Sequence, residues 1–214
     1  MKSKKRCVVT FVLLSVLLLG TVYFMVTTIH NIQGLKNLDE VTSMNDTDLK
    51  EGNYVKVPYE CMLNGYYNHS VYWYDYNYKL IRLKGKEEYL YVAVHSDEMD
   101  ALEGCDYIEF HPDSVGFVPK EEHYFIGKVE KNTAENRRMF ANRIQMVLES
   151  KFCMVNTVDN TNLQFYINEM NIPTQKKILR VKVGLVAGAF LLWLLSLRKM
   201  IKQKKENAYG NIGR

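Results

Sequence analysis

Two long apolar stretches lie near the two ends of the chain. Residues 7–29 contain no charged side chain and are dominated by Val, Leu, Phe and Thr. A helix rises about 1.5 Å per residue, so about 20 apolar residues cross the hydrocarbon core of a bilayer. Residues 183–197 form a second uncharged run, and its extension back to 178 admits only Arg180 and Lys182. Their long stems can reach the headgroup region, so we predict transmembrane helices at 7–29 and 178–197.

Each apolar stretch has an alternative interpretation. A cleaved signal peptide would have an apolar core of roughly 7 to 15 residues and a small-x-small cleavage site, and the first stretch is longer and lacks that site. The second stretch can also be a buried core helix, but a basic run and no folded segment follows it. We therefore expect two uncleaved membrane anchors.

The hydrophobic period changes to two between these helices. In the first such run, Val55, Val57, Tyr59 and Cys61 alternate with polar residues and predict one face of a strand. Asn64-Gly65 predicts a hairpin turn, because type I′ turns need positive φ angles. Further short strands are predicted at 71–78 with 80–83, 89–95, 107–110, 115–118, 124–130 and 163–167.

Helical spacing returns at one place in the middle of the chain. Asn132 with Glu135 three residues later predicts an N-cap, and an apolar stripe follows at Phe140, Ile144, Val147, Leu148 and Phe152. We predict a helix over about 133–152 and a short acidic helix at 97–103. Five to seven strands with one main helix predict an α+β domain at 51–175, of which a small OB-type barrel is one form. Residues 30–50 are expected to form a polar stem.

Charge is divided unevenly along the chain. Residues 1–6 carry four basic residues, 198–214 carry six basic and one acidic, and 30–175 carry 14 basic and 23 acidic. An acidic middle between two short basic tails argues against a nucleic-acid partner and for a lipid bilayer. The positive-inside rule then predicts a cell-membrane protein with both termini cytoplasmic and the middle domain outside.

Aromatic side chains mark one candidate binding surface. Tyr72, Tyr74, Tyr76 and Tyr78 fall on one face of a predicted strand. Their rings can stack on sugars or hold a peptide, since each has a flat apolar body and a polar tip. The alternative, which we favour, is a sheet face packed on the core or on the long helix.

Cysteine and histidine give little support for a chemical site. Three cysteines lie in the middle domain, at Cys61, Cys105 and Cys153, so at most one disulfide can form, with no pairing indicated. Buried thiols without a role are the alternative that we favour. The histidines match no metal-binding pattern, and no phosphate- or dinucleotide-binding glycine motif occurs in the domain. We therefore predict no metal, no cofactor and no catalytic residue.

A G-x-x-x-G sequence lies in the second apolar stretch. Gly184 and Gly188 share one helix face, where another helix can approach closely. The partner of this face would be the first helix of the same chain or a second copy of 178–197. The alternative is a chance spacing in a glycine-containing membrane helix.

Three segments carry a resemblance to a known type of protein. They are Leu49-Lys-Glu-Gly-Asn-Tyr-Val-Lys-Val57, Tyr89-Leu-Tyr-Val-Ala-Val94 and Tyr124-Phe-Ile-Gly-Lys-Val129. With the two apolar helices, the chain resembles small membrane proteins of low-GC Gram-positive bacteria, a family without an assigned activity. The resemblance implies a compact extracytoplasmic domain between two helices and transfers no functional residue.

Two functional hypotheses follow from these patterns. The first is a doubly anchored membrane protein whose outer domain binds a ligand or a partner, such as another membrane protein or a second copy, without catalysis. The second is an enzyme that acts on a component of the cell envelope, with polar residues brought together only by the fold. A pocket with a nucleophile and a base would favour the enzyme.

Overall fold

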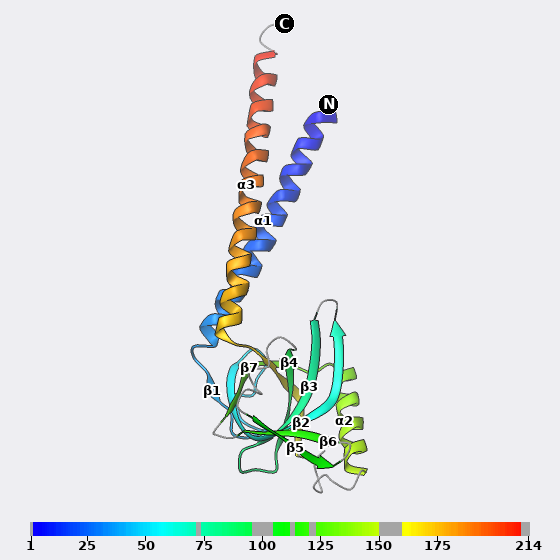
Figure 1. Ribbon diagram of the computed structural model, residues 1–214. Helices are drawn as coiled ribbons and strands as arrows, with labels where there is room; N and C mark the ends of the chain where they lie inside the picture. The colour runs from blue at the N-terminus through cyan, green and yellow to red at the C-terminus, as the bar shows by residue number, and fades with distance from the viewer. Residues whose placement is uncertain are drawn as a thin grey trace. The chain divides into compact units, whose positions relative to one another are not determined.

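The computed structural model describes residues 2–71, 74–95, 105–111, 114–119, 123–149 and 160–210. It consists of two compact units. One unit combines Met1–Gln33 with Ile172–Arg214, and the other is Gly34–Asn171. Figure 1 shows the first unit as two helices and the second as a sheet closed on itself.

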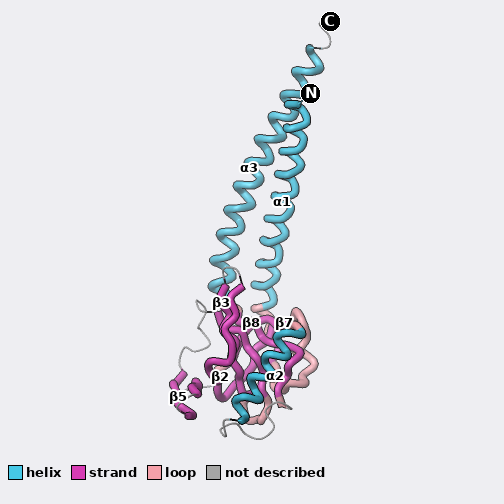
Figure 2. The backbone as a smooth tube through the Cα atoms, turned by 90° about the vertical axis from the view of Figure 1, so that its right-hand side faces the viewer, coloured by secondary structure: helices cyan, strands magenta, loops and turns pink. Residues whose placement is uncertain are grey.

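The helical unit is formed by α1 (Lys2–Gly34) and α3 (Ile172–Gly210), which run antiparallel and side by side (Figures 1 and 2). Both are long and apolar enough to cross a membrane, over Cys7–Gly34 and Ile172–Lys205. The prediction of two long apolar helices is confirmed, and both extend beyond the predicted ranges. Pro173 lies in the first turn of α3, where its missing N–H has no helical partner to lose.

Polar side chains lie between α1 and α3. The indole nitrogen of Trp193 donates to Ser15 Oγ at 2.9 Å, and Lys182 Nζ donates to Thr28 Oγ1 at 2.6 Å. Near the start of α3, Asn31 Nδ2 donates to Gln175 Oε1 at 3.3 Å. Large apolar side chains point the other way. Ile126 excepted, every exposed large apolar residue in the described part of the chain lies on α1 or α3.

The second unit contains the eight strands of the described residues. They are β1 (Asp39–Glu40), β2 (Tyr54–Val71), β3 (Tyr74–Leu83), β4 (Tyr89–His95), β5 (Cys105–His111), β6 (Ser114–Pro119), β7 (Tyr124–Lys131) and β8 (Thr161–Glu169). Gly85 adopts a φ of 70° in the turn between β3 and β4, a conformation that glycine tolerates best.

Five of these strands close into a mixed barrel in the order β2-β3-β4-β8-β7 and back to β2. β2 makes the closure because its residues 54–58 pair with β7 and its residues 59–71 pair with β3. The pair β4–β8 is parallel, and the other four pairs of the ring are antiparallel. The hairpin of β5 and β6 joins the sheet through β2, at Met62 and Leu63. The α+β class with a small barrel is therefore confirmed.

The barrel interior is filled by alternate residues of each strand. Leu90, Val92 and Val94 of β4 point inward, as do Phe125 and Val129 of β7, and all five are fully buried. The strands predicted at 89–95 and 124–130 are therefore confirmed. Close packing also fixes the small residue between them, since a Cβ at Gly127 would overlap the backbone oxygen of Asn168 on β8.

Two predictions for β2 are wrong. A register irregularity between Tyr59 and Cys61 reverses the alternation, so that Met62, rather than Cys61, joins the buried core. The predicted turn at Asn64-Gly65 does not occur, because β2 continues through it with a second irregularity between Leu63 and Tyr67. Glycine inside a strand marks a bulge as readily as a turn.

The segment predicted as a polar stem packs into the barrel instead. Val41 and Leu49 are buried and belong to the interior core. β1 lies parallel to β2, with Asp39 opposite Val55, and the Val41 N–H donates to the oxygen of Lys56 at 3.0 Å. Both residues stand among many polar ones, which is why the sequence pattern concealed their burial.

Helix α2 (Ala134–Glu149) lies on the outside of the sheet (Figure 2), where its Phe140 joins a cluster of side chains from β3, β4 and β8. Its cap is Thr133 and not Asn132, because Thr133 Oγ1 accepts the Asn136 N–H at 3.1 Å. Phe140 is the predicted stripe residue whose packing is described, and it lies buried against Tyr91 and Tyr78. The side chains of Ile144, Val147 and Leu148, all of Phe152, and the helix predicted at 97–103 lie outside the described residues.

Candidate functional site

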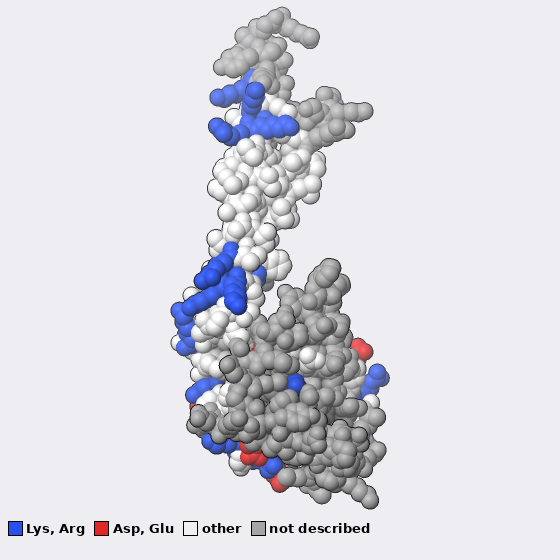
Figure 3. All heavy atoms as spheres, viewed as in Figure 1, with Lys and Arg blue, Asp and Glu red and all other residues white. Residues whose placement is uncertain are grey.

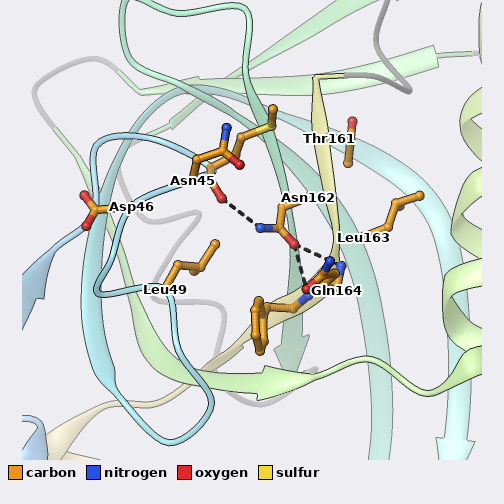
Figure 4. A pocket seen from close by; sticks show the side chains of 9 residues that line it. Asn45, Asp46, Leu49, Thr161, Asn162, Leu163 and Gln164 are labelled. Atoms are coloured by element: carbon orange, nitrogen blue, oxygen red, sulfur yellow. Dashed lines mark hydrogen bonds between the residues drawn. The ribbon is translucent and has the colours of Figure 1, made fainter.

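A pocket of about 490 Å³ opens between the loop that follows β1 and the start of β8. Its size falls in the range of about 300 to 1,000 Å³ that is usual for small-ligand sites. Figure 4 shows the two walls facing each other, with Asn45 and Leu49 on one and Asn162 and Gln164 on the other. The lining residues are Met44, Asn45, Asp46, Leu49, Thr161, Asn162, Leu163, Gln164 and Phe165.

A bulge in β8 shapes one wall of the pocket. The neighbouring β4 residues Leu90 and Tyr91 pair with Asn162 and Tyr166, so residues 163–165 have no partner opposite them on β4. Asn162 Oδ1 accepts the N–H groups of Gln164 at 2.9 Å and Phe165 at 3.2 Å, and this closes the bulge. As a result Leu163 packs on the cluster beneath α2 while Phe165 packs on the interior, although simple alternation along the strand predicted at 163–167 would put both on one face.

Asn162 also connects the two walls. Its Nδ2 donates to the backbone oxygen of Met44 at 2.7 Å, as the dashed line in Figure 4 shows. On the other side of Met44, its N–H donates to Glu88 Oε2 at 2.7 Å. These contacts hold the loop in one position before any ligand arrives, which lowers the entropy lost on binding.

The loop itself is ordered by Asp46. Its Oδ1 accepts the Asp48 N–H at 3.0 Å, and its Oδ2 accepts the Thr42 N–H at 3.4 Å. The amide side chains of Asn45 and Gln164 are different, because neither makes a hydrogen bond within the described part of the chain. Among the described residues, the pocket therefore offers two amides without a hydrogen-bond partner. Four apolar side chains, two from each wall, make up what we call its apolar base: Met44, Leu49, Leu163 and Phe165.

The tyrosine face was the sequence's main candidate site, and one of its four members is described in full. Tyr78 is buried beside α2, with ring-centroid distances of 5.1 Å to Phe140 and 5.5 Å to Tyr166. Core packing, the favoured interpretation, is what the structure shows at this position. Tyr74 and Tyr76 lie in β3 with side chains outside the described set, and Tyr72 lies outside it entirely.

Glu130 joins several side chains on the outer face of β7 and β8. Tyr166 Oη donates a short hydrogen bond to Glu130 Oε2, and Asn168 Nδ2 donates to Glu130 Oε1 at 3.1 Å. Burial and then the Glu130 carboxylate raise the pKa of Tyr166, and the same two causes raise the pKa of Tyr54. Both phenols therefore stay neutral, and both carboxylate oxygens of Glu130 have a partner.

Two charged residues are buried in the described part of the barrel unit. Lys79 and Glu169 are each 4% exposed. Strand alternation places them on the inward sides of β3 and β8, with Ile81 and Ile167. Burial lowers the pKa of Lys79, and the charge of Glu169 opposes that change. The sequence did carry a signal for Lys79, because it stands two residues before the inward residue Ile81. The alternation within β3 alone is enough to place Lys79 on the inward face.

The cysteines supply no activated nucleophile in the described residues. Cys61 is a free, half-buried thiol. Burial, and then the charge of Glu60, raise its pKa to about 11, although Arg82 lowers it somewhat. A thiol with this pKa is almost entirely protonated at neutral pH and is a poor nucleophile. The side chain of Cys105 and all of Cys153 lie outside the described residues, so for these two the choice between buried thiols and one disulfide stays open.

Gly184 and Gly188 lie away from the contact between α1 and α3. A Cβ built at either glycine would meet no atom within 4 Å, whereas the neighbouring Ala189 is 6% exposed. The first helix of the same chain is therefore not the neighbour of this glycine face. No cluster of three potential metal ligands occurs among the described residues.

No protein-family model matches the chain, and no curated protein and no solved structure shows significant similarity to it. The function is therefore argued from the pocket, the barrel and the helical unit. Sequence reasoning missed the pocket because its two walls are more than 100 residues apart along the chain. The local signal that the sequence did contain is Asn162, because asparagine side chains commonly bond to backbone groups two residues on, as in this bulge.

Proposed function

We propose that the chain is a two-span membrane protein whose barrel binds a ligand or a partner without catalysing a reaction. The pocket beside the β8 bulge carries this proposal. Its walls are fixed in place by Asn162, and two amide side chains that line it have no hydrogen-bond partner among the described residues. A preformed site with a few placed polar groups is the usual form of a binding pocket.

The helical unit supports the membrane location. Its large apolar side chains are exposed and its polar contacts lie between the helices, an arrangement suited to hydrocarbon and not to water. Figure 3 shows basic side chains at two levels of this unit with an uncharged stretch between them. Such spacing matches the headgroup layers on the two sides of a bilayer.

We further propose that both termini are cytoplasmic and that residues 30–177 lie outside. The antiparallel helices bring Lys2, Lys4, Lys5 and Arg6 to the same end of the unit as the basic residues of 198–205. Single cysteines at Asn45 and Asn207, introduced into a chain without its native cysteines, test this orientation. We expect an impermeant reagent to label the Asn45→Cys variant on intact cells, and labelling of Asn207→Cys alone would overturn the topology.

The strand connections support an OB-type barrel within this proposal. The first ring strand, β2, pairs with the second and the fourth, and the third and fifth are parallel, as in OB barrels. The hairpin of β5 and β6 and the position of α2 before the last ring strand are additions specific to this chain. OB barrels serve mainly as binding domains, which agrees with the proposed role.

The alternative of an envelope-acting enzyme makes a different demand on the pocket. It requires a nucleophile, or an acid and a base, beside the bound substrate. The thiol described in the barrel, Cys61, has a pKa of about 11 and does not line the pocket. The binding function is therefore the better supported of the two.

Photo-crosslinking in native membranes tests the binding function. A benzoylphenylalanine introduced at Gln164 reports on the pocket, and the same residue at Asn142, an exposed amide on α2, is the matched control. We expect a discrete adduct from the pocket position that is absent from the control. Equal labelling from both positions, or none from either, would contradict a binding role for the pocket.

A further inference from the structure

We propose that the pocket holds a short extended peptide segment of a partner protein, one that inserts an aliphatic side chain and carries no acidic residue beside it. This inference rests on the proposed binding function and names the chemistry of its ligand. Three properties of the nine lining residues carry it: the base, the two amides and the sign of the charge.

The base of the pocket is mainly aliphatic. Met44, Leu49 and Leu163 supply three of its four apolar side chains, and Phe165 supplies the fourth. Leu49 is 4% exposed and belongs to the barrel core, on which Met44 and Phe165 also pack, while Leu163 packs on the cluster beneath α2. An inserted aliphatic side chain would leave water and gain packing contacts along this surface.

The two amides match the polar groups of a peptide backbone. Each amide side chain presents one acceptor oxygen and an NH₂ donor, which are the same two functions as a peptide unit. Asn45 comes from the loop and Gln164 from β8, so they lie on opposite walls (Figure 4). A segment lying between these walls can exchange hydrogen bonds with both while its side chain points to the base.

The charge around the pocket is negative. Asp46 is the charged residue among the lining residues, and none of the nine is basic. Two further carboxylates are held close by, since Glu88 accepts the Met44 N–H and the Asp48 N–H binds Asp46. An acidic ligand would meet repulsion here, and a neutral or basic segment would not.

The same observations disfavour a carbohydrate. Sugar rings stack on the exposed face of an aromatic ring, because both surfaces are flat. Phe165 is the aromatic residue of the lining, and its ring packs on the interior core of the barrel. A base of flexible aliphatic side chains favours an inserted side chain over a flat ring.

Arrays of immobilised hexapeptides test the proposal with the full-length protein in detergent micelles. One set places Leu, Ile, Val or Met among neutral or basic residues, a second places Asp or Glu beside them, and a parallel array carries neutral oligosaccharides. The wild type is compared with Asn45→Trp, which fills the pocket from an exposed position, and with Asn142→Trp, an exposed amide on α2. Gln164→Ala removes one amide and adds no bulk.

We expect the first peptide set to bind and the acidic set to bind at least tenfold more weakly. Asn45→Trp should weaken binding at least tenfold and Gln164→Ala about threefold, while Asn142→Trp should match the wild type. Peptide binding that Asn45→Trp does not weaken would overturn the peptide proposal, as would acidic peptides that bind as tightly as the first set. Binding to the oligosaccharides alone, lost in Asn45→Trp, would overturn it too but leave the binding function in place. An absence of pocket-dependent binding and of the Gln164 photo-adduct would overturn both.

Discussion

The helical unit and the barrel distribute their side chains in opposite ways. Between α1 and α3 lie Ser15, Thr28 and Lys182 with their hydrogen bonds, while leucine and valine cover the outside. In the barrel unit, apolar side chains fill the interior and the space beneath α2, and Ile126 is its one exposed large apolar residue in the described part of the chain. The same residue types thus take opposite positions, which is the distribution expected if the helical unit lies in hydrocarbon, as proposed above, and the barrel in water.

The comparison has one exception that makes it more informative. Lys79 and Glu169 point into the barrel among apolar residues, as a polar pair does between membrane helices. A buried charge is tolerated when an opposite charge and hydrogen bonds accompany it. The two units therefore differ in whether their large apolar side chains are exposed, and not in where every polar group lies.

The largest expected effect comes from deleting an apolar side chain on the buried side of this comparison. Phe125 is fully buried in the barrel, and Phe125→Ala should lower the free energy of unfolding by about 3 to 5 kcal/mol, through lost transfer energy and a residual cavity. Leu191 is 60% exposed on α3 and serves as the matched control. Leu191→Ala should change the free energy of unfolding by less than about 0.5 kcal/mol. Denaturant unfolding of the full chain in micelles measures both. Equal effects would show that the two units do not differ as described.

The next effect concerns the half-buried thiol of the barrel. Burial raises the pKa of Cys61 from 9.0 to about 11, so the folded chain keeps a proton that the unfolded chain loses. The stabilisation that comes from this retained proton is fully present below pH 9. Between about pH 9 and 11 the free energy of unfolding should fall by about 2 to 3 kcal/mol. Unfolding measured across this range in the wild type and in Cys61→Ala isolates the effect, because other titrating groups are common to both. Parallel curves for the two proteins would contradict the burial of Cys61.

The predictable parts of the fold are those with a strong local signal. The apolar runs of α1 and α3 are long enough to be recognised without tertiary information, and the alternation of β4 and β7 gives their inward faces directly. The burial of Tyr78 followed from the same logic, since a regular aromatic face next to a predicted helix is usually a packed one. These features depend on period alone.

The unpredicted parts all involve a change of period or a distant partner. The irregularity at Glu60 exchanged Cys61 for Met62 in the core, and the β8 bulge separated Leu163 from Phe165. Each bulge shifts every later side chain to the other face, so a pattern read without it is wrong from that point. The pocket is formed by the β8 bulge together with the Met44 loop. No local pattern in either segment predicts its contact with the other.

The third prediction compares two adjacent positions on α3. Ala189 is 6% exposed, and Ala189→Ile should overpack the contact between the helices and destabilise the helical unit by about 1 to 3 kcal/mol. Gly188→Ile should leave that contact intact, because a Cβ there meets no atom within 4 Å. Thermal unfolding followed by far-ultraviolet circular dichroism distinguishes them. A loss of stability in Gly188→Ile equal to that in Ala189→Ile would show that the glycine face does pack on α1.

The same pair of variants tests self-association. If a second copy packs on Gly184 and Gly188, Gly188→Ile should lower the dimer fraction measured by sedimentation in detergent while the monomer stays folded. Ala189→Ile is the control, because its side chain lies on the other side of the helix. An unchanged mass for Gly188→Ile would mean that lipid alone covers the glycine face.

The smallest effect compares two threonine hydroxyls, one from each unit. Thr133 Oγ1 accepts the Asn136 N–H at the start of α2, a donor that has no helical partner, so Thr133→Ala should destabilise the barrel unit by about 1 kcal/mol. Thr27 Oγ1 instead donates to the Phe24 oxygen inside α1. That oxygen keeps its helical bond without the hydroxyl, and Thr27→Ala should change stability by less than about 0.5 kcal/mol. Denaturant midpoints of the two variants against the wild type measure the difference. An equal loss from both would mean that the hydroxyl in α1 supports its helix as much as the cap supports α2, and the distinction between the two units would then fail at the level of single hydrogen bonds.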